Sequence, residues 1–174
     1  MKIFKTISLA IITLFFFQSC DEAEKLTSVD ITTDIVKQIT IATNQSGDFE
    51  KTLIFNLSES SELEEYLNHI EGVKITKADY RVAAFPGDLF AAGTLTVVSE
   101  NQTFGPFIHS DFKDDFDNGT VFKLEGVDKL NVIASKIKNT KQVSVTISGT
   151  AQVDEEFTMT LEVSIGLVVT AQAL

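Results

Sequence analysis

The sequence has one cysteine, two prolines and no tryptophan among its 174 residues. The one cysteine, Cys20, excludes disulfides within the chain, which need pairs, and a zinc site built from thiolates, which needs at least two. Basic residues are also few, with 14 Lys and Arg against 25 Asp and Glu, so the formal net charge at pH 7 is -11. Phosphate contacts are made mainly by Lys and Arg, and we therefore expect no nucleic-acid partner.

The first 20 residues have the three parts of a secretory signal. Lys2 and Lys5 precede an apolar run from Ile7 to Phe17, and the small Ser19 stands directly before Cys20. The apolar run has eleven residues. This length fits the core of a signal peptide, about 7–15 residues, and is too short to span a bilayer, which needs about 20.

The end of this signal resembles the lipobox of bacterial lipoproteins, because a cysteine stands at the junction. The resemblance implies that signal peptidase II cuts between Ser19 and Cys20, that the Cys20 thiol receives a diacylglyceryl group, and that the new amino group is acylated. Phe17 and Gln18 depart from the commonest lipobox pattern. Such loose lipoboxes are frequent in lipoproteins of Bacteroidota. The alternative is that Cys20 is a chance residue in an ordinary secreted or uncleaved leader.

Three acidic residues, Asp21, Glu22 and Glu24, follow the cysteine. A short acidic run in this position resembles the signal that sends Bacteroidota lipoproteins to the outer face of the outer membrane. The resemblance covers residues 1 to 25 and implies an outer-membrane lipid anchor, with the domain facing the periplasm or the cell surface. The partners it implies are the membrane, through the acyl chains, and a protein or glycan at the cell surface.

The resemblance and the composition together predict three parts of the chain. Residues 1–19 are the expected lipoprotein signal peptide, residues 20–28 the expected acylated cysteine with an acidic tether, and residues 29–174 a single predicted domain. No Pro/Gly-rich linker divides this domain, and its length is sufficient to bury a core without disulfides or metals. Loss of Lys2 and Lys5 with the signal peptide changes the net charge from -11 to -13.

Most of the domain has the two-residue period of β-strands. The alternation of apolar and polar residues is strongest from Phe157 to Ala171, and Val143 to Val153 precede it with the same period, which predicts a C-terminal hairpin. Further strands are predicted at 29–43, 49–57, 73–85, 93–99, 103–109 and 119–124. In the first of these, Ile39, Ile41 and Ala42 suggest a break or bulge near Val36.

Two segments change to a helical period. Ser61 and Glu64 form a capping-box pattern that predicts a helix ending at about residue 71, before Gly72. Asp128 is the predicted cap of a second helix, whose apolar residues are Leu130, Ile133, Ala134 and Ile137. The predicted fold class is therefore mainly β, an antiparallel β-sandwich, Ig-like or jelly-roll-like, with two short amphipathic helices.

The sequence contains two histidines, His69 and His109, as near-neutral acid-base groups. His69 falls at the surface of the first predicted helix. His109 stands next to Ser110 and Asp111, but adjacency in sequence is no argument for a catalytic triad, and Ser110 is predicted to cap a short helical turn. Because GxSxG, HExxH, CxxC and glycine-rich phosphate motifs are all missing, we predict no catalytic residues, with an uncharacterised hydrolase as the alternative.

Four carboxylates, Asp111, Asp114, Asp115 and Asp117, gather before the Asn118-Gly119 turn. Carboxylate oxygens are the ligands that Ca²⁺ prefers, so these residues are the candidate metal site and calcium is the candidate ion. Their spacing does not fit an EF-hand loop. The alternative is a solvated acidic turn whose phenylalanines, Phe112 and Phe116, pack against the sandwich.

These observations predict a lipid-anchored, non-catalytic β-sandwich of the outer membrane or cell surface that acts as a binding, assembly or structural module. The alternative functions are calcium-supported adhesion and glycan binding at the surface. The lack of Trp and the presence of only two tyrosines, Tyr66 and Tyr80, disfavour a glycan site built on aromatic stacking.

Overall fold

The computed structural model describes residues 28–43, 47–153 and 155–173. The predicted cleavage and lipidation residues, Ser19 and Cys20, and the predicted export residues, Asp21, Glu22 and Glu24, lie outside the described residues. Among the described residues, no helix is long and apolar enough to cross a membrane.

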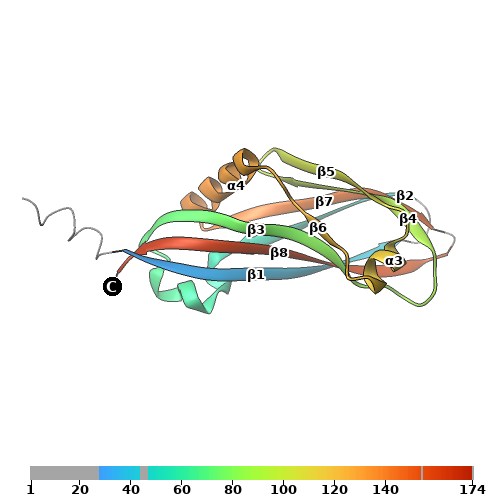
Figure 1. The fold of residues 1–174 in the computed structure, drawn as a ribbon, viewed down its shortest axis with the longest axis horizontal. Helices are drawn as coiled ribbons and strands as arrows, with labels where there is room; N and C mark the ends of the chain where they lie inside the picture. The colour runs from blue at the N-terminus through green and yellow to red at the C-terminus, as the bar shows by residue number, and fades with distance from the viewer. Residues whose placement is uncertain (1–27, 44–46, 154, 174) are drawn as a thin grey trace, which may run out of the picture.

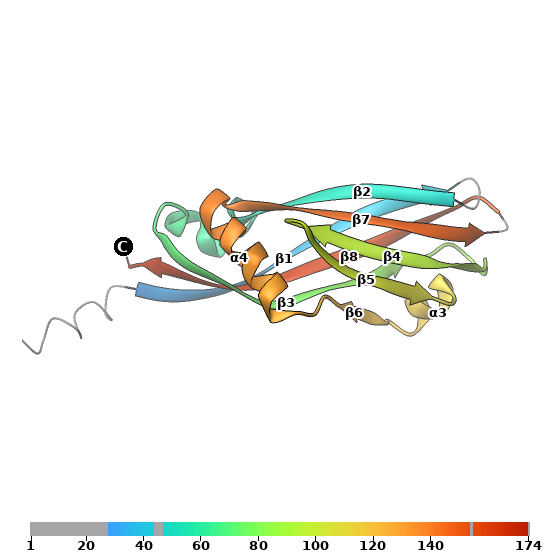
Figure 2. The same ribbon diagram turned by 90° about the horizontal axis from the view of Figure 1, so that it is seen from above.

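Two antiparallel sheets of four strands each pack face to face as a sandwich (Figures 1 and 2). The eight strands are β1 (Ser28–Thr43), β2 (Gly47–Asn56), β3 (Ile70–Ala84), β4 (Ala91–Ser99), β5 (Gln102–His109), β6 (Val121–Lys123), β7 (Gln142–Val153) and β8 (Phe157–Gln172). All eight predicted strands are therefore present, with bounds shifted by a few residues.

The strand order identifies the sandwich as a jelly roll. One sheet has the order β1-β8-β3-β6 and the other has the order β2-β7-β4-β5, so that the chain changes sheet at every connection except the β4–β5 hairpin. An Ig-like sandwich would pair its first two strands within one sheet, whereas β1 and β2 lie in different sheets. The β-sandwich prediction is confirmed, and its jelly-roll form is the one observed.

Strand β8 lies at the centre of its sheet and supplies much of the core. It pairs with β1 without interruption, from Ser28 opposite Gln172 to Thr43 opposite Phe157, and with β3 on its other side. Its inward-facing residues are all buried, namely Phe157, Met159, Leu161, Val163, Ile165, Leu167, Val169 and Ala171. Strict alternation places every one of them on the inner face, where each large side chain stabilises the fold by about 1.5–3 kcal/mol through burial.

The predicted bulge near Val36 in the first strand is wrong. Two polar residues, Thr33 and Lys37, stand at inward-facing positions and interrupt the apolar pattern there. The Thr33 hydroxyl is buried and lies 2.9 Å from the Ser60 hydroxyl, and Lys37 pairs with Glu59 at 2.6 Å. These partners come from the segment between β2 and β3, so β1 continues unbroken.

The first predicted helix is shorter and tighter than expected. The segment forms two 3₁₀ turns, η1 (Leu57–Glu59) and η2 (Ser61–Tyr66), and β3 already begins at Ile70. Because Ile70 must pair with Ala171 at the end of the sheet, too few residues remain for an α-helix to residue 71. The buried Leu57 and Leu63 still anchor the turns to the core.

The second predicted helix is confirmed as α4 (Val127–Thr140), with Ile133, Ala134 and Ile137 buried. Its N-cap is Gly126 and not the expected Asp128, which lies in the first turn. A further short helix, α3 (Phe112–Asp117), connects β5 to β6. The side chain of Asp111 caps α3 by accepting from the Lys113 amide, so the expected cap at Ser110 is displaced by one residue.

Candidate functional site

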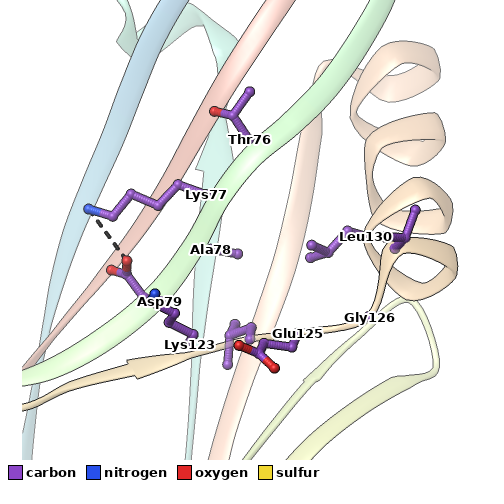
Figure 3. A pocket seen from close by; sticks show the side chains of 10 residues that line it. Thr76, Lys77, Ala78, Asp79, Lys123, Glu125, Gly126 and Leu130 are labelled. Carbon is purple, nitrogen blue, oxygen red and sulfur yellow. Dashed lines mark ion pairs between the residues drawn. The ribbon is translucent and has the colours of Figure 1, made fainter.

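A cleft of about 460 Å³ lies between β3, the chain that follows β6, and the start of α4. Figure 3 shows that Lys77 and Asp79 project from β3 away from α4, while Leu130 points from α4 toward Ala78. The cleft therefore has a charged side on the outer face of the sheet and an apolar side between β3 and the helix.

The apolar side of the cleft is formed by the segment that follows β6 and by the start of α4. The amide of Leu124 donates to the carbonyl of Ala78 at 2.8 Å, which holds the chain against β3 until α4 begins. Leu124 is buried, Leu130 is half-buried, and Val127 is 75% exposed at the first position of the helix. An apolar surface is thus available beside the charged side chains.

A β-bulge positions the charged side. The pairing of β3 with β8 shifts between Ile75 and Lys77, so that Thr76 and Lys77 both stand beside Gly166. A Cβ atom on Gly166 would lie 2.6 Å from Asp34 Oδ1 and 3.1 Å from Lys77 Cβ. The missing side chain at Gly166 therefore leaves room for the bulged residues on the outer face.

A second hollow of about 320 Å³ shares Lys77 and Asp79 with the cleft and continues across the outer face of the same sheet. It reaches Arg81 on β3, Glu162 on β8 and Val36 on β1. We call the two hollows together the cationic groove.

Two ion pairs run along the cationic groove. Lys77 Nζ lies 3.4 Å from Asp79 Oδ2, and Arg81 makes two contacts with Glu162 Oε1, from Nε at 2.8 Å and from Nη2 at 2.7 Å. Gln38 also donates to Glu162 at 3.1 Å, and this bond, followed by the contact with Arg81, lowers the pKa of the Glu162 carboxyl. The Glu162 carboxylate is therefore held as an anion by neighbouring donors.

The cations of the cationic groove are more exposed than the carboxylates. The side chains of Lys77 and Arg81 are 53% and 51% exposed, against 11% for Asp79 and 17% for Glu162. Lys123 on β6 stands opposite Asp79 and is exposed. Within the ranges that the structure describes, Lys123 has no ion-pair partner. The groove thus presents exposed cations beside the recessed carboxylates of Asp79 and Glu162, and the exposed carboxylate of Glu125 lines it as well.

A separate polar network lies inside the sandwich, where His109 at the end of β5 meets Tyr80 of β3 and Asp115 of α3. The Nδ1 atom of His109 lies 2.7 Å from Asp115 Oδ2, and Nε2 lies 2.9 Å from the Tyr80 hydroxyl. Because a carboxylate can only accept, Nδ1 carries the proton, and Nε2 of the neutral ring accepts from the Tyr80 hydroxyl. Every polar atom of the imidazole is therefore satisfied.

Aromatic rings cover this network. The His109 ring stacks on Phe112 at 4.4 Å between centroids, and Phe122 lies 4.4 Å away on β6. Burial lowers the pKa of His109, against the opposing effect of Asp115, and burial also raises the pKa of Tyr80. His109 and Tyr80 are each 1% exposed and Asp115 is half-buried, so the network connects the two sheets and α3 from within the sandwich.

The structure does not bring the four candidate calcium ligands together. Asp111 caps α3, Asp115 bonds His109, Asp117 pairs with Lys113, and the side chain of Asp114 is exposed. The described part of the chain contains no group of three or more His, Cys, Asp or Glu side chains that could hold a metal ion.

The cationic groove is a feature of the structure that was not predicted from the sequence. The pattern that could have indicated it is the charged residue at every second position of the predicted strand 73–85, namely Lys77, Asp79 and Arg81, which places all three on the outward face of the strand. The side chain of His69, in contrast, is exposed as expected, although it lies after η2 and not within a helix.

No family model matches this sequence, and no curated protein matches it. Among solved structures, the chain is similar to the decameric capsid protein of BFDV, with 10% identity, a TM-score of 0.45, and coverage of 81% of this chain and 99% of that one. It is also similar to a structure of Desmodium yellow mottle tymovirus, with 14% identity, a TM-score of 0.41, and 84% of each chain covered. At this distance neither likeness bears on what this chain does.

Proposed function

We propose that this protein is a lipid-anchored, non-catalytic binding or assembly module of the outer membrane or cell surface. The observation that carries the proposal is the place where the domain begins. Strand β1 starts at Ser28, eight positions after Cys20, and Ser28 pairs with Gln172 at one end of the elongated sandwich (Figure 1). The eight residue steps from Cys20 to Ser28 span at most about 29 Å, so an acylated Cys20 would hold this end of the sandwich near the membrane.

The arrangement of the domain supports a binding role. With the tether at one end, both outer faces of the sandwich run away from the membrane and stay accessible (Figure 2). In the hydrogen-bonded Asp–His pair, His109 is buried and Asp115 is half-buried, whereas the cationic groove opens outward. The surface features thus suit recognition of a partner better than turnover of a substrate.

The anchor is tested by expressing the full chain in a Gram-negative host that processes lipoproteins. We expect mass spectrometry to find acyl chains on Cys20, and we expect Cys20→Ser to release the protein from the membrane fraction while Ser19→Ala leaves it there. A protein with an unmodified Cys20, or one whose Cys20→Ser variant stays membrane-bound, would overturn the anchoring.

Export to the outer face is tested separately. We expect added protease to cut the wild-type protein on intact cells of a Bacteroidota host, and to spare a variant in which Asp21, Glu22 and Glu24 are replaced by Asn and Gln.

The proposal that the protein is non-catalytic has a test of its own. It would be overturned if the purified protein hydrolysed a glycan, peptide or ester and the His109→Gln variant did not.

A further inference from the structure

The turn that ends α3 holds an asparagine directly before a glycine, Asn118-Gly119. Every other asparagine of the chain precedes a residue with a side chain. Asn118 and Gly119 are both exposed, and a Cβ atom on Gly119 would have no neighbouring atom within 4 Å. Among the described residues the Asn118 side chain has no hydrogen-bond partner, whereas Asn56 Oδ1 accepts from the amide of Ser58 at 3.0 Å. The Asn118 carboxamide is therefore open to solvent and to reaction with its neighbour.

An asparagine before glycine is chemically labile, because glycine has no side chain to obstruct attack by its own backbone nitrogen. Base removes the proton of the Gly119 amide, and the nitrogen forms a bond to Asn118 Cγ. The bond from Cγ to the side-chain nitrogen breaks, and that nitrogen takes a proton from water and leaves as ammonia. Water then opens the cyclic imide at either carbonyl and yields aspartate or isoaspartate. The net reaction is hydrolysis of the amide, and no oxidant or cofactor takes part.

The last turn of α3 opposes this attack in the folded protein. Asn118 has a ψ angle of -7°, and closing the imide ring requires rotation about this bond. Two hydrogen bonds hold the turn, from the Gly119 amide to the Phe116 carbonyl at 3.1 Å and from the Thr120 amide to the Asp115 carbonyl at 2.9 Å. Helix α3 has only six residues, however, and short helices open locally at little cost in free energy. Reaction at Asn118 therefore requires this turn to open.

We propose that Asn118 deamidates spontaneously at a rate set by opening of the last turn of α3, and that the product loosens α3 from the core. The Asp115 carbonyl accepts from Thr120, while the Asp115 side chain lies 2.7 Å from His109 Nδ1. An isoaspartate lengthens the backbone at residue 118 and so separates the Thr120 amide from the Asp115 carbonyl. Either product also places a carboxylate at the C-terminal end of the helix, where a negative charge is unfavourable. Neither effect depends on the proposed membrane anchor.

Deamidation is measured on the purified full chain in a mildly alkaline buffer, by mass spectrometry of its peptides. We expect the peptide with Asn118 to gain the mass difference between an amide and a carboxylic acid, and an isoaspartate methyltransferase to label it. The peptide with Asn101, which is also exposed in a turn, should stay unchanged. Unfolding in urea should accelerate the reaction at Asn118 about tenfold or more, because the closed turn no longer protects it.

The variants separate opening of the turn from the chemistry. We expect Asp111→Ala, which removes the side-chain cap of α3, to accelerate deamidation about fivefold by opening the helix more often. The matched control is Asp128→Ala, which removes the same charge from the first turn of α4 and should change the rate less than about twofold. Asn118→Gln should abolish the reaction at this position. Asn118→Asp gives the charge without the lengthened backbone and should lower the Tm less than the isoaspartate does.

Several results would overturn the proposal. An unmodified Asn118 in the folded protein, under conditions that convert a synthetic peptide of residues 114–122, would exclude the site. Equal rates with and without urea, or an equal acceleration by Asp128→Ala, would exclude control by the turn of α3. Equal rates at Asn118 and Asn101 would exclude a special role of the glycine. An unchanged Tm after conversion would show that the product does not loosen α3.

Discussion

The two outer faces of the sandwich have the same backbone pattern and different chemistry. The outer face of the β1-β8-β3-β6 sheet carries ion pairs and exposed cations, while that of the β2-β7-β4-β5 sheet carries mainly hydroxyl groups, with Asp48 and Glu50 on its edge strand β2. The hydroxyl face has cross-strand contacts between Thr52 and Thr146 at 2.9 Å and between Thr94 and Thr150 at 3.1 Å.

The difference shows at which strand positions the fold leaves the residue type unconstrained. On both sheets most inward-facing residues are apolar and form one core, and the buried polar exceptions, such as Thr33 and His109, have polar partners. The outward-facing residues meet water on either sheet, and nothing in the fold requires charge on one face and hydroxyl groups on the other.

The largest expected effect is a comparison of glycines in the two sheets. A Cβ on Gly149 would lie 2.0 Å from the Thr94 carbonyl oxygen, a backbone atom, whereas the nearest atom to a Cβ on Gly166 belongs to the Asp34 side chain. We expect Gly149→Ala to lower the free energy of unfolding by about 3 kcal/mol or more and Gly166→Ala by about 1 kcal/mol. Urea denaturation measures both, and equal losses would contradict the contrast.

The next effect concerns the interior that both faces share. In Tyr80→Phe, His109 Nε2 loses its donor inside the core. We expect the free energy of unfolding to fall by about 2 kcal/mol, the cost of a buried unsatisfied polar atom. Tyr66→Phe is the matched control, because Tyr66 is half-buried outside the network, and its loss should stay below about 0.5 kcal/mol. Similar losses in the two variants would show that the network contributes little.

The same network predicts a pH dependence. Because burial lowers the pKa of His109 in the folded protein, the unfolded chain binds the extra proton first as the pH falls below the usual histidine value of about 6.5. The contribution of His109 to the free energy of unfolding is fully present above that pH. Below it, the contribution falls by about 1.4 kcal/mol per pH unit until the pKa of His109 in the folded protein is reached. The slope, measured by urea denaturation, should vanish in His109→Gln and persist in His69→Gln. A slope that persists in His109→Gln would assign it to another group.

The smallest effect is expected on the hydroxyl face. Thr146→Val removes the exposed contact with Thr52 and keeps the side-chain shape. Both hydroxyl groups are hydrogen-bonded to water in the unfolded chain, so we expect the free energy of unfolding to change by less than about 0.5 kcal/mol. A loss above about 1 kcal/mol would mean that the hydroxyl face is a stabilising feature.

Local sequence was sufficient for the strands and for α4, since each has a sustained period. It failed in β1, where the inward-facing Thr33 and Lys37 are satisfied by Ser60 and Glu59 from a distant segment. It failed also in η2, because pairing of Ile70 with Ala171 shortens the connection. In both cases the deciding partner is remote in sequence, and periodicity contains no information about it.

The sequence by itself determined the fold class and the candidate lipid attachment at Cys20, because alternation and a lipobox are local patterns. Only the tertiary structure decided that the sandwich is a jelly roll, that Asp115 bonds His109 and does not join a calcium site, and that Lys77, Arg81 and Lys123 share one groove. The physical reason is that strand order and register bring together residues whose separation along the chain leaves no local trace.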